Sequence, residues 1–105
     1  MSTKKKKKYG TNQLEKEIGF LSFGNMLGAY RLSEEMTQRD FSKMLGISPS
    51  SLCDLEKARK IPSISRAKDI ADTLGLSQKQ WVQAAIQDQL KREHLDFEVS
   101  ISEDF

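Results

Sequence analysis

The stretch of sequence from Thr37 to Pro62 decides the fold and reads TQRDFSKMLGISPSSLCDLEKARKIP. Thr37 is typical of a helix N-cap, and Gly46 is typical of a residue that ends a helix. Ser48 and Pro49 then predict a new helix, because a hydroxyl caps the helix and proline suits its first position. The stretch therefore predicts two short helices joined by a tight turn, which is the pattern of a helix-turn-helix.

The second helix of this pair has an apolar side and a polar side. Leu52 and Leu55 supply its buried face, and the first helix is expected to pack across it through Phe41 and Leu45. Short polar groups then remain on the outside of a rigid rod that fits a DNA major groove. These groups are Ser48, Ser50, Ser51 and Asp54.

Helical spacing of apolar residues predicts three further helices around this pair. The first begins at Phe20 and ends within residues 31–35. Another starts after Pro62, carries Ile64 on its apolar side and ends at Gly75. The methionines at positions 26, 36 and 44 are interpreted as packing residues of these helices.

The last predicted helix starts at Ser77, where Gln80 completes the pattern of a capping box. It places Trp81 in the core and runs to about residue 93. Four apolar residues then alternate with polar ones, which is the period of a half-buried strand. These residues are Leu95, Phe97, Val99 and Ile101.

A lone strand has to pair, because it cannot satisfy its own backbone hydrogen bonds. Two interpretations of this segment stay open. It is either a frayed tail that packs its apolar residues on the same domain, or a strand that pairs with a second subunit or with the sheet of a partner protein.

A chain of 105 residues suits one domain. We predict an all-α, five-helix domain over residues 17–93, with the helix-turn-helix at 37–58. A flexible lysine-rich arm is expected at residues 1–16, and a short C-terminal β-strand with an acidic tail is expected at 94–105.

The net charge is +2, and the charged residues are unevenly distributed along the chain. Lys4 to Lys8 form a run of five cations, and four acids lie between residues 94 and 105. Residues 38–68 carry seven cations and three acids, a local net charge of +4 that supports contact with DNA. The lysine run is either a phosphate-binding arm or simply solvated.

Catalysis is not expected, because the chain combines one histidine and one cysteine with no glycine-rich phosphate loop. The single Cys53 cannot form an internal disulfide or a multi-cysteine metal site, which suits a reducing cytoplasm. The longest uncharged stretch, Ile18 to Tyr30, is shorter than the roughly 20 residues of a membrane span. No cofactor, metal or membrane partner is predicted.

The sequence resembles the lambda-repressor-like (XRE) helix-turn-helix family from about Phe23 to Leu90. The resemblance rests on the order and spacing of Arg31, Thr37, Gln38, Phe41, Gly46, Ile47, Ser48, Leu52, Leu55, Glu56, Arg59 and Pro62. It implies a sequence-specific repressor that binds double-stranded operator DNA as a homodimer, with half-sites about one helical turn apart.

The resemblance also implies a role for individual residues. Gln38 would bind a phosphate, and Arg31 and Glu56 would form a structural ion pair. Base-facing or groove-facing side chains are implied at Ser48, Pro49, Ser50 and Asp54. Contacts to the flanking DNA backbone are implied at Lys57, Arg59 and Lys60. With Ser51 and the nearby cation Arg39, these residues make up the expected DNA surface.

Two positions depart from the family pattern. Pro49 replaces a frequent polar residue and removes a possible base contact. Ala58 stands where the family often has glycine, so a left-handed conformation there would cost about 1 kcal/mol. The recognition helix also lacks Arg, Asn and Gln, the best bidentate readers of G and A, so the sequence does not predict the operator.

The C-terminal alternation looks like the strand that ends some antitoxins of the lambda-repressor-like class. This narrower resemblance implies an alternative function, in which the chain neutralises a cognate toxin protein through residues 95–101.

Overall fold

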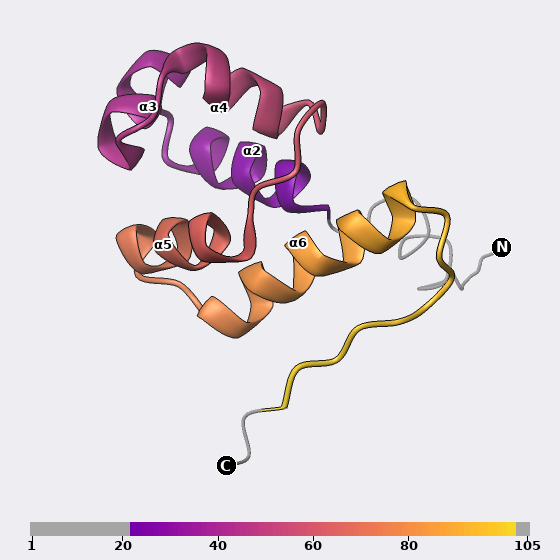
Figure 1. The fold of residues 1–105 in the computed structure, drawn as a ribbon. Helices are drawn as coiled ribbons and strands as arrows, with labels where there is room; N and C mark the ends of the chain where they lie inside the picture. Colours follow the sequence, from indigo (N-terminus) through magenta and orange to yellow (C-terminus); the bar gives the residue numbers. More distant parts are fainter. Residues whose placement is uncertain (1–21, 103–105) are drawn as a thin grey trace, which may run out of the picture.

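The computed structural model describes residues 22–102, and this part of the chain contains five α-helices (Figure 1). Their bounds are α2 Phe23–Ser33, α3 Gln38–Leu45, α4 Pro49–Glu56, α5 Ile64–Leu74 and α6 Gln78–Arg92. The expected lysine arm, the lysine run and Phe20 lie outside the described residues. The predicted all-α helix-turn-helix fold is confirmed, because α3 and α4 form the expected pair of short helices.

Serine or threonine hydroxyls cap all five helices at their N-termini. Each hydroxyl accepts a hydrogen bond from the backbone N–H three residues further along, which satisfies one of the free donors of the first turn. The capping residues are Ser22, Thr37, Ser48, Ser63 and Ser77. At the other end, Gly46 and Gly75 close α3 and α5 in the left-handed conformation, with φ of 73° and 71°.

Ten buried apolar side chains contributed by all five helices form the core. They are Phe23, Leu27, Phe41, Leu52, Leu55, Ala67, Ile70, Ala71, Trp81 and Ala85. The rings of Phe23 and Trp81 meet edge to face with centroids 5.2 Å apart, which joins α2 to α6. One side of α4 packs against this core, so the opposite side of the helix is free for other contacts.

Two of the expected packing residues lie on the surface instead. The side chains of Met44 and Ile64 are 42% and 58% exposed, respectively. Phe41 and Ala67 of the same two helices are fully buried, so the small core of this domain is filled without Met44 and Ile64. The interpretation of both residues as core residues is therefore wrong.

Gly24 allows α2 to contact the last turn of α4 directly. A Cβ atom built at Gly24 would lie 2.3 Å from the carbonyl oxygen of Leu55 and 2.9 Å from that of Glu56. No side chain fits in this space, so the backbones of the two helices meet here. Gly28, one turn later, is different, because its nearest neighbours are side-chain atoms of Glu56 at 3.8 Å or more.

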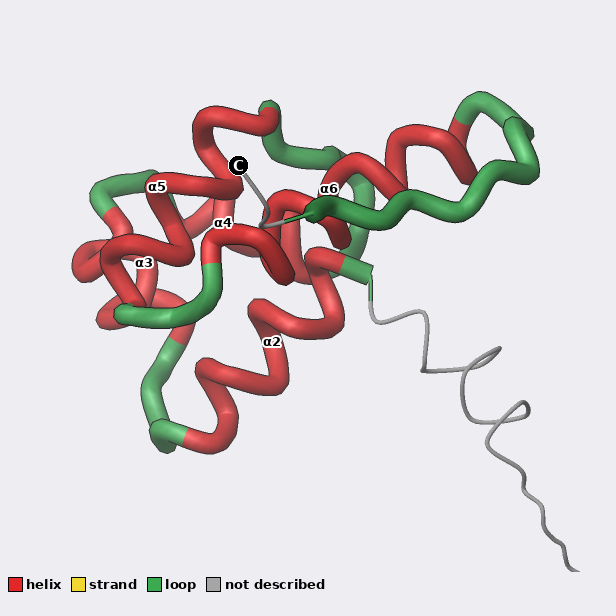
Figure 2. The backbone as a smooth tube through the Cα atoms, turned by 90° about the horizontal axis from the view of Figure 1, so that it is seen from below, coloured by secondary structure: helices red, strands yellow, loops and turns green. Residues whose placement is uncertain are grey.

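Residues 95–102 form no strand within the described part of the chain, so the expected C-terminal β-strand is not found there. The segment turns back after α6 and runs alongside that helix in an extended course (Figures 1 and 2). A strand requires a second backbone to pair with, and the single chain offers this segment only side chains. The exposure of Leu95 and Phe97, at 44% and 63%, also shows that the segment does not pack all of its apolar residues on the domain.

Candidate nucleic-acid interface

The turn between α3 and α4 determines the direction of α4, which is the expected recognition helix. Gly46 ends α3, and the N–H of Ile47 donates to the carbonyl of Ser42 at 3.0 Å. Ser48 then caps α4, and Pro49 occupies its first turn. Leu52 and Leu55 point into the core, so the N-terminal part of α4 faces outwards.

The three serines at the start of α4 differ in what they can bind. The Ser48 hydroxyl accepts the N–H of Ser51 and donates to the Ser51 hydroxyl, both at 3.0 Å, so helix capping already occupies it. Ser50 is exposed, and its hydroxyl has no partner in the part of the chain that the structure describes. Ser50 is therefore the serine of this helix that is free to bind an external group.

The expected pairing of Arg31 with Glu56 is present in the structure as a two-pronged contact. The guanidinium of Arg31 donates to both carboxylate oxygens of Glu56, at 2.8 and 3.1 Å, which joins α2 to the last residue of α4. The side chains are only 17% and 8% exposed, so the pair is poorly screened by solvent. The hydrogen bond to Glu56 raises the pKa of Arg31, which stays charged.

Gln38 joins this ion pair, which the sequence did not predict. Its side-chain Nε2 donates to Glu56 Oε1 at 3.0 Å. Glu56 thereby holds α2, the start of α3 and the end of α4 together. An amide NH₂ group has two hydrogens, so one of them fixes the orientation of Gln38 on Glu56 and the other is available for a further hydrogen bond.

A second cluster lies at the far end of α4, where Asp54 binds two of the cations expected to meet DNA. Its carboxylate lies 2.9 Å from Arg59 Nε and 3.8 Å from Lys60 Nζ. The hydrogen bond that Arg59 donates to Asp54, with a smaller contribution from the one it donates to Cys53, raises the pKa of Arg59. The structure thus gives Asp54 internal partners, whereas a base contact was expected from the resemblance.

The loop after α4 is held by the end of α6. Arg92 donates to the carbonyls of Ala58 and Arg59, at 3.2 and 3.3 Å. Ala58 has a φ of 59°, so the left-handed conformation anticipated at this position is present without a glycine. Backbone strain is therefore present at Ala58, directly after α4, and the hydrogen bonds from Arg92 of α6 hold this loop in place.

Asp88 of α6 contacts the start of α2, and no sequence pattern indicated this contact. Its Oδ2 accepts the N–H of Phe23 at 2.8 Å, across 65 residues of sequence. Burial raises the pKa of Asp88, and the hydrogen bond from Phe23 partly offsets this effect. Asp88 and Arg92 together tie α6 to the start of α2 and to the adjacent loop after α4.

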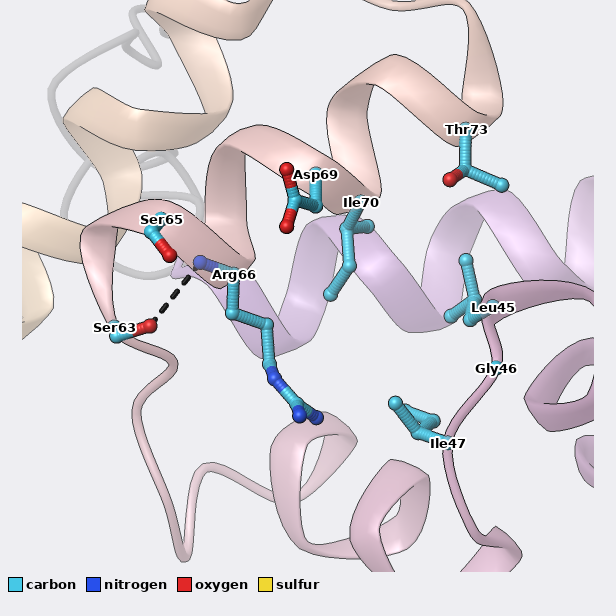
Figure 3. Close-up of a pocket in the computed structure, with 9 residues that line it drawn as sticks. All are labelled: Leu45, Gly46, Ile47, Ser63, Ser65, Arg66, Asp69, Ile70 and Thr73. Atoms are coloured by element: carbon cyan, nitrogen blue, oxygen red, sulfur yellow. Dashed lines mark hydrogen bonds between the residues drawn. The ribbon is translucent and has the colours of Figure 1, made fainter.

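A groove of about 310 Å³ lies between the α3–α4 turn and α5 (Figure 3). Arg66 extends across it from α5 towards Ile47, and its guanidinium has no charged partner among the described residues. Arg39 and Lys57 are likewise exposed without an ion pair in that part of the chain. Within the described residues, Arg39, Lys57 and Arg66 are therefore unpaired cations beside the helix-turn-helix, in addition to the cluster at Asp54.

Residues 22–102 contain no cluster of three or more metal-ligating side chains. The helices of the same range do not combine the length and the apolar character of a membrane span.

Comparisons with known proteins agree with the geometry of α3 and α4. The family model described as helix-turn-helix matches residues 27–78, which include both helices. The chain also resembles the uncharacterized HTH-type transcriptional regulator YazB of Bacillus subtilis (strain 168), with 38% identity over 55 residues. This alignment covers 52% of the chain and 80% of YazB. No solved structure matches.

The chain therefore belongs to the helix-turn-helix family of DNA-binding transcriptional regulators. Proteins of this family are not typically enzymes.

Proposed function

We propose that the protein is a sequence-specific repressor that binds the DNA upstream of its own operon as a homodimer. The proposal rests on the two-sided character of α4. Its apolar residues are buried in the core, whereas its N-terminal turn, which contains Ser50, is exposed. A helix held in this way inserts its first turn into a major groove, where side chains reach the edges of the bases.

The proposed contacts fall into two kinds. Base edges are read by the first turn of α4, through Ser50 and the apolar ring of Pro49 against a thymine methyl group. Ser48 and Ser51 shape this turn through their mutual hydrogen bonds. Phosphates are bound by the following side chains around it: Gln38, Arg39, Lys57, Arg59 and Lys60.

Asp54 has a different role in this proposal from the one that the resemblance implied. We assign it to holding Arg59 and Lys60 at the end of α4 rather than to reading a base, because both cations already bind its carboxylate. Specificity then rests on few base contacts and partly on DNA shape.

The test is binding of the full chain to the upstream region of its operon and to a shuffled sequence of equal length, at two salt concentrations. We expect tighter binding to the upstream region and a loss of affinity at higher salt for both DNAs, because phosphate contacts release counterions. Equal affinity for the two DNAs would contradict sequence-specific binding.

A second candidate function is that of an antitoxin, in which the segment 95–101 binds a toxin protein. The exposure of Leu95 and Phe97 beside the acidic Asp96 and Glu98 favours it, since this surface suits a basic protein partner. The test is co-purification of the full chain, and of a chain lacking residues 95–105, with the product of any small basic reading frame of the same operon. Binding that depends on the segment would support this function, and absence of binding would contradict it.

A further inference from the structure

The C-terminal segment has one backbone edge that is bonded and one that is free. Gln87 of α6 donates from Nε2 to the carbonyl of Phe97 at 2.8 Å and accepts the N–H of Val99 at Oε1, at 2.9 Å. Gln83, one turn earlier, accepts the N–H of Ile101 at 3.4 Å. The two glutamines therefore bind the segment along its inner edge, as a neighbouring strand would.

The bonded groups all belong to odd-numbered residues. In an extended chain the N–H and C=O groups of successive residues point to opposite edges, so those of Glu98 and Ser100 point away from α6. These groups have no hydrogen bond in the part of the chain that the structure describes. Among the described helices, none lies along this outer side of the segment (Figure 1). An unpaired edge of this kind is a template for a further strand.

We propose that the strand that pairs with this edge is the same segment of a second copy, antiparallel and centred on Val99. This proposal rests on the homodimer proposed above and specifies which segments of its two subunits contact each other. It makes a two-stranded ribbon, each strand of which is already bound to its own α6 by Gln87 and Gln83.

The distribution of charge along the segment supports this register. Pairing centred on Val99 places Glu98 opposite Ser100 and Asp96 opposite Ser102, so every acid of residues 96–102 faces a serine. Like charges directly opposite each other destabilise a strand pair, and other registers contain such pairs. A register centred on residue 97 places Asp96 opposite Glu98, and one centred on residue 98 places Glu98 opposite itself.

Registers centred C-terminal to Val99 also place acids opposite each other. A register centred on residue 100 places Asp96 opposite Asp104, and one centred on residue 101 places Glu98 opposite Asp104. Of the five registers centred on residues 97–101, only the one at Val99 leaves every acid without an acid partner.

The side chains support the same register. Val99 faces its own copy as a non-hydrogen-bonded pair, in which side chains approach most closely, and Phe97 faces Ile101. Phe97 is 63% exposed in the single chain, so pairing removes apolar surface from water. A two-stranded ribbon is marginal alone, but here each strand is already attached to a helix.

Cysteine cross-linking tests the register. In a chain in which Cys53 is replaced by serine, we expect Val99→Cys to form a covalent dimer under mild oxidation. It should do so at least about tenfold faster than Phe97→Cys or Ile101→Cys, because a disulfide needs Cβ atoms about 3.5–4.5 Å apart. A mixture of the Phe97→Cys and Ile101→Cys chains should form the mixed dimer faster than either chain alone dimerises.

Circular dichroism tests whether each variant is folded, and sedimentation measures the dimer before oxidation. Faster cross-linking of Phe97→Cys alone would overturn the register, and a monomer that cross-links nowhere would overturn the strand pairing. DNA binding is measured on the same samples. Selective DNA binding by a protein that does not pair at residue 99 would leave the proposed repressor standing and overturn only this inference.

Discussion

Ala58 is the residue at which backbone strain lies closest to the recognition helix. Its φ of 59° belongs to the left-handed region, which costs an alanine about 1–2 kcal/mol and a glycine almost nothing. Glycine also adds about 0.4–1 kcal/mol of conformational freedom to the unfolded chain. We therefore expect Ala58→Gly to raise the free energy of unfolding by about 0.5–1 kcal/mol.

Urea unfolding of the two chains measures this effect. Lys57→Gly is the control, because Lys57 has a φ of −90° and gains nothing from glycine. An unchanged or lower stability of Ala58→Gly would contradict the account of strain at this position.

Asp54 is the second residue whose role, holding Arg59 and Lys60, can be tested by a single substitution. Replacing it with asparagine removes the negative charge from Arg59 and Lys60, so both cations become available to phosphates. We expect Asp54→Asn to bind all DNA sequences severalfold more tightly and to increase the salt dependence by about one counterion.

Fluorescence anisotropy on operator and shuffled DNA measures this change, with Asp72→Asn as the control. Asp72 also forms an ion pair, with Lys68 at 3.1 Å, but within α5. If Asp54→Asn changes binding at one base position only, Asp54 contacts a base and does not act by holding Arg59 and Lys60.

At the scale of the helices, the contact between α2 and α4 depends on Gly24. Gly24→Ala places a methyl group 2.3 Å from a backbone carbonyl oxygen, so the helices must move apart. We expect a loss of about 1–3 kcal/mol of stability, as is typical of overpacking. Gly28→Ala in the same helix meets only side-chain atoms at 3.8 Å and should be neutral or stabilising by up to about 1 kcal/mol.

Thermal unfolding of both variants separates the two positions. Equal melting temperatures for Gly24→Ala and Gly28→Ala would contradict a backbone contact at Gly24.

The contact between α6 and α2 carries a pH dependence. Burial raises the pKa of Asp88 in the folded protein, so folding favours its protonated form. Its contribution to stability is present below the ordinary aspartate pKa of about 4 and is lost as the pH rises through the raised pKa. Asparagine retains an oxygen to accept the Phe23 N–H and does not titrate.

We therefore expect the stability of Asp88→Asn, relative to the unsubstituted chain, to increase as the pH rises from about 4 towards 7. Urea unfolding across this range provides the measurement. A relative stability that decreases with rising pH would show that the charged carboxylate stabilises the contact.

At the scale of the whole molecule, the sequence predicted what depends on neighbours along the chain. The starts of α3 to α6 follow from Thr37, Ser48, Ser63 and Ser77, because an N-cap acts within three residues. The long-range contacts of Gly24, Asp88 and Arg92 were not predictable, since their partners lie 31 to 65 residues away in sequence and have no local pattern.

The C-terminal segment shows the same division. Its alternating pattern predicted a β-strand, but the described part of the chain provides glutamine side chains where a strand needs a second backbone, and no strand forms there. A pattern of period two predicts extension and leaves the partner undefined.

The central claim is that the first turn of α4 reads the bases. The most direct measurement is selection from a randomised DNA pool by the full chain and by Ser50→Ala, followed by sequencing of the bound DNA. We predict that Ser50→Ala selects DNA of a different base preference at one position of each half-site, while the rest of the site is unchanged. If the two chains select the same sequence at every position, α4 does not read DNA through Ser50 and the claim is contradicted.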